Sequence, residues 1–225
     1  MPELIVMLTR NDKTVQDAKE IFLSCKDLPV QLWGIKNIGL RFSEIKDLVD
    51  TMKAAEKTTF LEVVTLSEDE CLAGAQMAVD CGFDFLLGAV LYQPVADYCR
   101  KMQVKWLPYC GKVYGRPVIL EGTPVEIADS ALSLQEAGCY GTNVLACRSE
   151  KEPERIIKEV IKKVNFPVVV AGNIASFARI GAVQKLTPWA FTIGSALFDG
   201  KFCPDRPIRS QIKAVCAYME QGSAF

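Results

Sequence analysis

Hydrophobic residues follow two alternating patterns along the chain. Short, nearly continuous apolar runs are typical of strands that are buried on both faces of a parallel sheet. Between them, apolar residues recur at spacings of three and four, as in amphipathic helices. The predicted strands cover residues 4–8, 31–35, 59–64, 84–90, 105–110, 141–146, 167–172 and 190–194. The predicted helices cover 14–25, 41–57, 67–82, 123–138, 152–164 and 176–186, followed by a final one at 207–220.

This alternation predicts the fold class. Eight strand–helix units joined by short loops within 225 residues indicate an α/β fold, a single (β/α)8 TIM barrel. A doubly wound open sheet is the alternative. We expect one domain over residues 1–225, since no linker or low-complexity segment interrupts the pattern. The connection at 110–124 is too long for a bare loop, and its segments "KVY" and "PVILE" predict a small hairpin on the face that carries function in such barrels.

Composition narrows the function. The chain has 26 basic and 27 acidic residues, net charge −1, which argues against nucleic-acid binding. No apolar run is long enough to span a membrane, and the N-terminal residues lack the features of a signal peptide, so we expect a cytoplasmic protein. The nine cysteines form no C-x-x-C pair and are expected to be reduced and structural. Because the chain has no histidine, catalysis must use other side chains or a cofactor, and we expect no metal.

A glutamate lies inside the third predicted strand. Helices cover the outer face of a barrel strand, so an ionised side chain there should point into the lumen, and alternation places Phe60, Glu62 and Val64 inward. Lys36 ends the second strand on its inward face. A buried carboxylate needs a partner, and Lys36 on the neighbouring strand is the expected one. Glu62 is the candidate general base, and Lys36 the candidate acid, base, oxyanion stabiliser or Schiff-base amine. A purely structural ion pair is the alternative.

Arg10 and Asn143 complete the candidate catalytic set. Arg10 closes the first strand, where it either clamps an anionic group or is a surface residue beside a helix cap formed by residues 11–14. Asn143 lies in the sixth strand, where a buried amide needs hydrogen-bond partners. Further candidates near strand ends or in loops on the same face are Lys112, Glu121, Arg148, Cys110 and Cys147.

Two glycine-containing turns, "AGNIAS" and "IGSALF", follow the seventh and eighth predicted strands. In TIM barrels these two loops, with the N-terminus of a short extra helix, commonly form a phosphate site, and residues 195–200 predict such a helix. Glycine lets backbone amides approach an anion closely, and a helix N-terminus favours negative charge. Relief of crowding at the strand ends is the alternative reason for the glycines. The predicted phosphate ligands are Gly172, Asn173, Ile174, Gly194, Ser195 and Ala196.

These turns resemble those of the ribulose-phosphate-binding TIM-barrel superfamily, and most of all those of the histidine-biosynthesis ProFAR isomerases and their cyclase relatives. The resemblance covers about residues 105–200 and includes the insertion at 110–122. It implies a substrate phosphate bound at the two turns. The chain departs from that family at the ends of strands one and five, which read Leu8-Thr9-Arg10 and Tyr109-Cys110-Gly111 where the isomerases have catalytic aspartates. Residues 60–69 resemble the glutamate-bearing strand of keto-deoxy-phosphogluconate aldolases, without their lysine in the sixth strand.

The sequence therefore predicts a phosphosugar-type isomerase, epimerase or lyase that acts without metal on a small phosphorylated substrate. The alternative is a catalytically silent ligand-binding or partner protein that keeps the phosphate site. FMN bound at that site is a third hypothesis; otherwise no cofactor is expected. The expected partner is a phosphorylated small molecule, not a nucleic acid or a membrane, and a homo-oligomer is compatible with the sequence.

Overall fold

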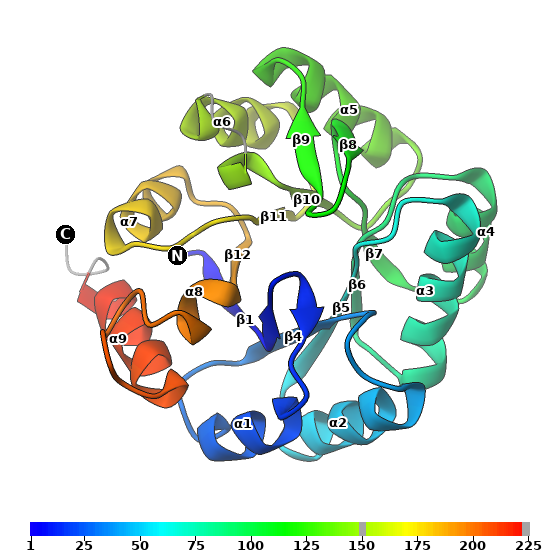
Figure 1. The fold of residues 1–225 in the computed structure, drawn as a ribbon. Coiled ribbons are helices and arrows are strands. Elements are labelled where there is room, and N and C mark those ends of the chain that lie inside the picture. The colour runs from blue at the N-terminus through cyan, green and yellow to red at the C-terminus, as the bar shows by residue number, and fades with distance from the viewer. Residues whose placement is uncertain (149–151, 222–225) are drawn as a thin grey trace.

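Eight parallel strands curl into a barrel that is surrounded by helices (Figure 1). This computed structural model describes residues 1–148 and 152–221. The strand order is β10-β11-β12-β1-β4-β5-β6-β7, and a parallel bridge between Tyr109 and Asn143 brings the two ends of the sheet together. The strands are β1 (Glu3–Met7), β4 (Leu32–Lys36), β5 (Thr58–Val63), β6 (Phe85–Gly88), β7 (Lys105–Leu107), β10 (Thr142–Val144), β11 (Val168–Val170) and β12 (Ala190–Ile193).

The predicted TIM barrel is confirmed. Strands β6, β7, β10, β11 and β12 are shorter than the predicted runs, and β1, β4 and β5 have the predicted length but are shifted by one residue. The helices are α1 (Ala18–Cys25), α2 (Phe42–Ala54), α3 (Glu68–Cys81), α4 (Gln93–Lys101), α5 (Pro124–Glu136), α6 (Pro153–Lys163), α7 (Phe177–Leu186), α8 (Ser195–Phe198) and α9 (Ile208–Gln221). The periodicity did not single out α4, which is short and buries only Val95, Ala96 and Cys99. The single-domain prediction for 1–225 includes residues 149–151 and 222–225, which lie outside the described residues. Among the described helices, none has the length and apolar character needed to cross a membrane.

Strand alternation divides the apolar residues into two layers. Residues such as Phe60 pack with one another inside the barrel, while Leu61 and Val63 belong to the layer between the sheet and the helices. This confirms the predicted inward face of β5 for Phe60 and Glu62. Val64 lies beyond the end of β5 and packs with the outer layer, because the two-residue alternation ends with the strand.

Two antiparallel hairpins project from the barrel. The predicted hairpin within 110–122 is confirmed as β8 (Lys112–Tyr114) and β9 (Ile119–Glu121). A second hairpin, which is not among the predicted elements, joins β2 (Thr9–Arg10) to β3 (Lys13–Thr14). Its two turn residues, Asn11 and Asp12, have φ values of +51° and +59°, as a type I′ hairpin turn requires. The reading of residues 11–14 as a helix cap is therefore wrong, since α1 begins only at Ala18.

Candidate functional site

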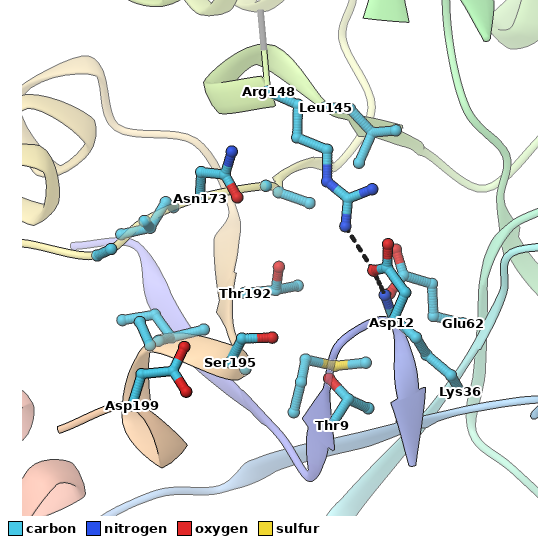
Figure 2. Close-up of a pocket in the computed structure, with 18 of the residues that line it drawn as sticks. Thr9, Asp12, Lys36, Glu62, Leu145, Arg148, Asn173, Thr192, Ser195 and Asp199 are labelled. Carbon is cyan, nitrogen blue, oxygen red and sulfur yellow. Dashed lines mark hydrogen bonds and ion pairs between the residues drawn. The ribbon is translucent and has the colours of Figure 1, made fainter. Parts of the chain in front are cut away.

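A cavity of about 280 Å³ lies at the C-terminal ends of the barrel strands. Figure 2 shows Asp12, Lys36 and Glu62 on one side and Asn173 and Ser195 on the other. We call the first side, together with Arg148, the ionic end of the cavity. We call the backbone turns at residues 172–174 and 194–196 the glycine-turn end. The barrel therefore brings charged side chains and glycine-containing backbone turns into one cavity.

Lys36 and Glu62 are register partners on the neighbouring strands β4 and β5. The Lys36 Nζ atom lies 3.5 Å from Glu62 Oε2, and both side chains are only 6% exposed. The expected pairing of these residues is confirmed. Lys36 Nζ also donates a hydrogen bond to Asp12 Oδ1, from the turn of the β2–β3 hairpin. The ammonium group of Lys36 is thus held between two carboxylates.

Two uncharged donors meet the other oxygen of Glu62. Oε1 accepts hydrogen bonds from Tyr109 Oη at 3.0 Å and from Asn143 Nδ2 at 3.2 Å. Burial, together with the charge of Glu62 and the hydrogen bond to it, raises the pKa of Tyr109 well above its ordinary value, so the phenol stays protonated. These bonds leave Glu62 Oε2, beside Lys36, as the oxygen without a hydrogen bond among the described residues.

Arg148 ends the short 3-10 helix η1 (Ala146–Arg148) and reaches across the cavity. Its Nη2 donates to Asp12 Oδ1 at 2.6 Å, and its Nη1 donates to the carbonyl oxygen of Val118 at 2.8 Å. Burial raises the pKa of Asp12, but the hydrogen bond from Arg148 and the charge of Lys36 outweigh it, so this pKa lies below its ordinary value. Asp12 is therefore ionised near neutral pH, between two cations.

The glycine-turn end is built by close backbone approaches. Gly172 has φ +87°, and a Cβ atom there would lie 2.4 Å from Arg148 Cγ. A Cβ atom at Gly194 would lie 2.6 Å from Thr9 Oγ1. The predicted short helix after the eighth strand is confirmed as α8, and the Oγ of its first residue, Ser195, accepts a hydrogen bond from the Asn11 backbone at 3.2 Å. All six predicted phosphate ligands line the cavity: Gly172, Asn173, Ile174, Gly194, Ser195 and Ala196.

Arg10 does not line this cavity. Its side chain is 53% exposed, and its Nη2 lies 2.9 Å from Oδ1 of Asp199, just after α8. Arg10 thus holds the β2–β3 hairpin against α8. Lys112 and Glu121 are also outside the cavity and pair with each other across the β8–β9 hairpin at 3.0 Å.

Cys110 and Cys147 are buried, and neither lines the cavity. Burial raises the pKa of each thiol to about 11. Each sulfur is therefore protonated at neutral pH, which makes it a poor nucleophile. The expectation of structural cysteines remains the interpretation that this geometry favours.

Asp12 and Tyr109 are absent from the candidates predicted from the sequence, and Arg148 is among them only as a loop residue. The available signal for Asp12 was the pair Asn11-Asp12 between Thr9 and Thr14, since both residue types tolerate the positive φ of a two-residue hairpin turn. For the described part of the chain, no group of three His, Cys, Asp or Glu side chains comes together as a metal ion would require. Metal-independent chemistry stays a prediction.

The fold and the cavity define the class: a TIM barrel with a polar cavity at the C-terminal ends of its strands. A structure of native KDPGal shares the fold at a TM-score of 0.70 and 14% identity, over 99% of this chain and 96% of that one. A tryptophan synthase structure from M. tuberculosis has a TM-score of 0.67 and 14% identity, over 98% of this chain and 92% of that one. A chain of the Amycolatopsis orientalis BexX/CysO complex has a TM-score of 0.65 and 17% identity, over 99% of this chain and 89% of that one. No protein-family model and no curated protein matches the chain. At such identities the likeness concerns the fold.

Proposed function

We propose that this protein binds a small phosphorylated, sugar-like compound and catalyses isomerase, epimerase or lyase chemistry that begins with a proton transfer. The main support for this proposal is that the buried Lys36–Glu62 pair and the two glycine turns face one cavity. A phosphate bound by backbone amides at the glycine-turn end would place the rest of the ligand at the ionic end. The cavity volume of about 280 Å³ favours a small sugar phosphate over FMN.

Each side chain at the ionic end has a role in this proposal. Glu62 Oε2, the oxygen without a hydrogen bond among the described residues, would take a proton from a carbon next to a carbonyl group. The Lys36 ammonium would stabilise the negative charge that then develops on the carbonyl oxygen. Tyr109 and Asn143 would position Glu62. Among the hypotheses for Lys36, its placement between two carboxylates supports the oxyanion role over the Schiff-base amine.

Deuterium exchange tests this function without knowledge of the product. A panel of ketose and aldose phosphates would be incubated with the protein in D2O, and loss of the proton next to the carbonyl followed by 1H NMR. We expect exchange for at least one compound that the protein binds. Glu62→Gln and Lys36→Met should each slow it by a factor of about 10² to 10⁴. Glu121→Gln is the matched control, because Glu121 is exposed on the β8–β9 hairpin.

Two results would contradict the proposed activity. If both site variants kept full exchange, Glu62 and Lys36 would not be the reacting groups. If the protein bound sugar phosphates in a thermal shift assay but exchanged and converted none of them, the alternative of a silent phosphate-ligand-binding protein would hold.

A further inference from the structure

The ionic end contains equal numbers of positive and negative side chains, and every one of them is paired. Lys36 contacts Asp12 and Glu62, and Arg148 contacts Asp12. The side chains are 6% exposed for Lys36 and Glu62, 17% for Arg148 and 24% for Asp12. A charge so far from water interacts strongly with its partner, so this cluster has no spare cation for a second anionic group of a ligand.

Asp12 holds the position that a ligand carboxylate would need. Its Oδ1 accepts from both Lys36 Nζ and Arg148 Nη2. A carboxylate between an ammonium and a guanidinium group is a common way for a protein to bind an acidic ligand. Here the chain supplies that carboxylate itself, from the turn of the β2–β3 hairpin.

Two carboxylate oxygens at the ionic end remain available as acceptors for a ligand. Within the described residues, Asp12 Oδ2 and Glu62 Oε2 accept no hydrogen bond, and both side chains line the cavity. Acceptors of this kind complement hydroxyl groups, which donate, and oppose a carboxylate, which does not. A second anion would also be repelled by Asp12 and Glu62.

We infer that Asp12 is a specificity-determining residue that takes the place of a substrate carboxylate and restricts the cavity to monophosphates whose other end is neutral and hydroxylated. This rests on the proposed phosphate site at the glycine turns. It divides the proposed substrates into two groups: polyhydroxy aldehydes, ketones and alcohols with one phosphate are accepted, and phosphorylated sugar acids are rejected.

Two probes of the same carbon skeleton test this inference. Glycerol 3-phosphate and 3-phosphoglycerate differ in having a hydroxymethyl or a carboxylate group at the end far from the phosphate. Isothermal titration calorimetry of the full chain at pH 7.5 would measure both dissociation constants, with inorganic phosphate as competitor. We expect glycerol 3-phosphate to bind at least about tenfold more tightly, since like charges in a partly desolvated site repel.

Asp12→Asn should weaken or abolish this preference, because it leaves Lys36 and Arg148 with one carboxylate instead of two. We expect the ratio of the two dissociation constants to move by about tenfold towards 3-phosphoglycerate. Asp47→Asn is the matched control: it removes the same charge from an exposed residue that pairs with Lys19 on the outside of the barrel.

The outcomes separate this inference from the proposed function. Equal binding of both probes, or tighter binding of 3-phosphoglycerate to the unchanged protein, would overturn the inference and leave the phosphate site intact. A preference that Asp12→Asn and Asp47→Asn alter equally would overturn the role of Asp12. If neither probe nor inorganic phosphate bound, the phosphate site and this inference would both fail. The ratio measured on the unchanged protein decides the substrate class even if Asp12→Asn does not fold.

Discussion

Arg148 Nη2 lies 2.6 Å from Oδ1 of Asp12, although the two residues are 136 positions apart in the sequence. Because Arg148 also donates to Val118, this one side chain joins η1, the β2–β3 hairpin and the end of the β8–β9 hairpin. Its stem packs over Gly172 at the glycine-turn end. Asp12 and Arg148 therefore connect the two ends of the cavity.

Replacing Arg148 should lower the free energy of unfolding more than replacing Arg10, the exposed arginine of the β2–β3 hairpin. Arg148→Met leaves the Val118 carbonyl without its side-chain donor and leaves Asp12 with Lys36 as its one cationic partner among the described residues, and we expect a loss of about 1–3 kcal/mol in the free energy of unfolding. Arg10→Met removes an exposed ion pair with Asp199, for which about 0–1 kcal/mol is expected. Urea unfolding followed by circular dichroism compares the two variants. Equal losses would show that Arg148 is not a structural connection.

Replacing Gly172 by alanine should lower stability more than the same replacement at Gly138, which has a similar backbone conformation but no close neighbour. Gly172 and Gly138 have φ values of +87° and +80°, so both variants share the strain of a left-handed residue. Only at Gly172 would the new Cβ meet another atom, Arg148 Cγ at 2.4 Å. We expect Gly172→Ala to lose stability and phosphate affinity, and Gly138→Ala to lose only about 1 kcal/mol of stability. Unchanged phosphate affinity in Gly172→Ala would contradict the proposed phosphate site.

The ion pairs of Asp12 should make stability depend on pH in the acid range. Folding lowers the pKa of Asp12 below its ordinary value of 3.8. A carboxyl group of this kind stabilises the folded state fully above its unfolded pKa, and the contribution is lost as the pH falls through the lower folded value. The difference in unfolding free energy between the unchanged protein and Asp12→Asn should thus be constant from pH 7 to pH 5 and decrease towards pH 3. Urea unfolding at several pH values measures it; a difference that grows on acidification would refute the assignment.

Thiol labelling should distinguish exposed from buried cysteines. Burial raises the pKa of Cys99 to about 12 and those of Cys139 and Cys216 to about 11, so these thiols should react slowly at pH 8. Cys139 and Cys203 are both partly exposed, but the raised pKa slows Cys139, so Cys203 should supply the fast phase, roughly one thiol of the nine. Ellman's reagent with the native and urea-unfolded protein measures both, and Cys203→Ser should remove the fast phase. Rapid labelling of several thiols in the native state would show that the core is more open than described.

The sequence by itself determined the barrel and part of its cavity, because these follow from short-range periodicity. The repeated apolar runs predicted the eight strands, and the two-residue alternation placed Lys36 and Glu62 on one inward surface. The paired turns at Gly172 and Gly194 marked consecutive strand ends. Each of these inferences needs only neighbouring residues and the rule that functional groups in a closed barrel gather at the C-terminal ends of the strands.

Only the tertiary structure decided how the charges at the ionic end are arranged. Asp12 enters the cavity because a two-residue turn folds the chain back after β1, and Arg148 meets it from η1, which is remote in sequence. Arg10, which the sequence favoured, lies outside because the same hairpin directs it towards Asp199. A loop side chain carries no periodic signal, and its direction depends on turn geometry and on partners that folding brings near. For that reason the sequence located Lys36 and Glu62, which lie on strands, and only the folded chain showed that Asp12 and Arg148 join them.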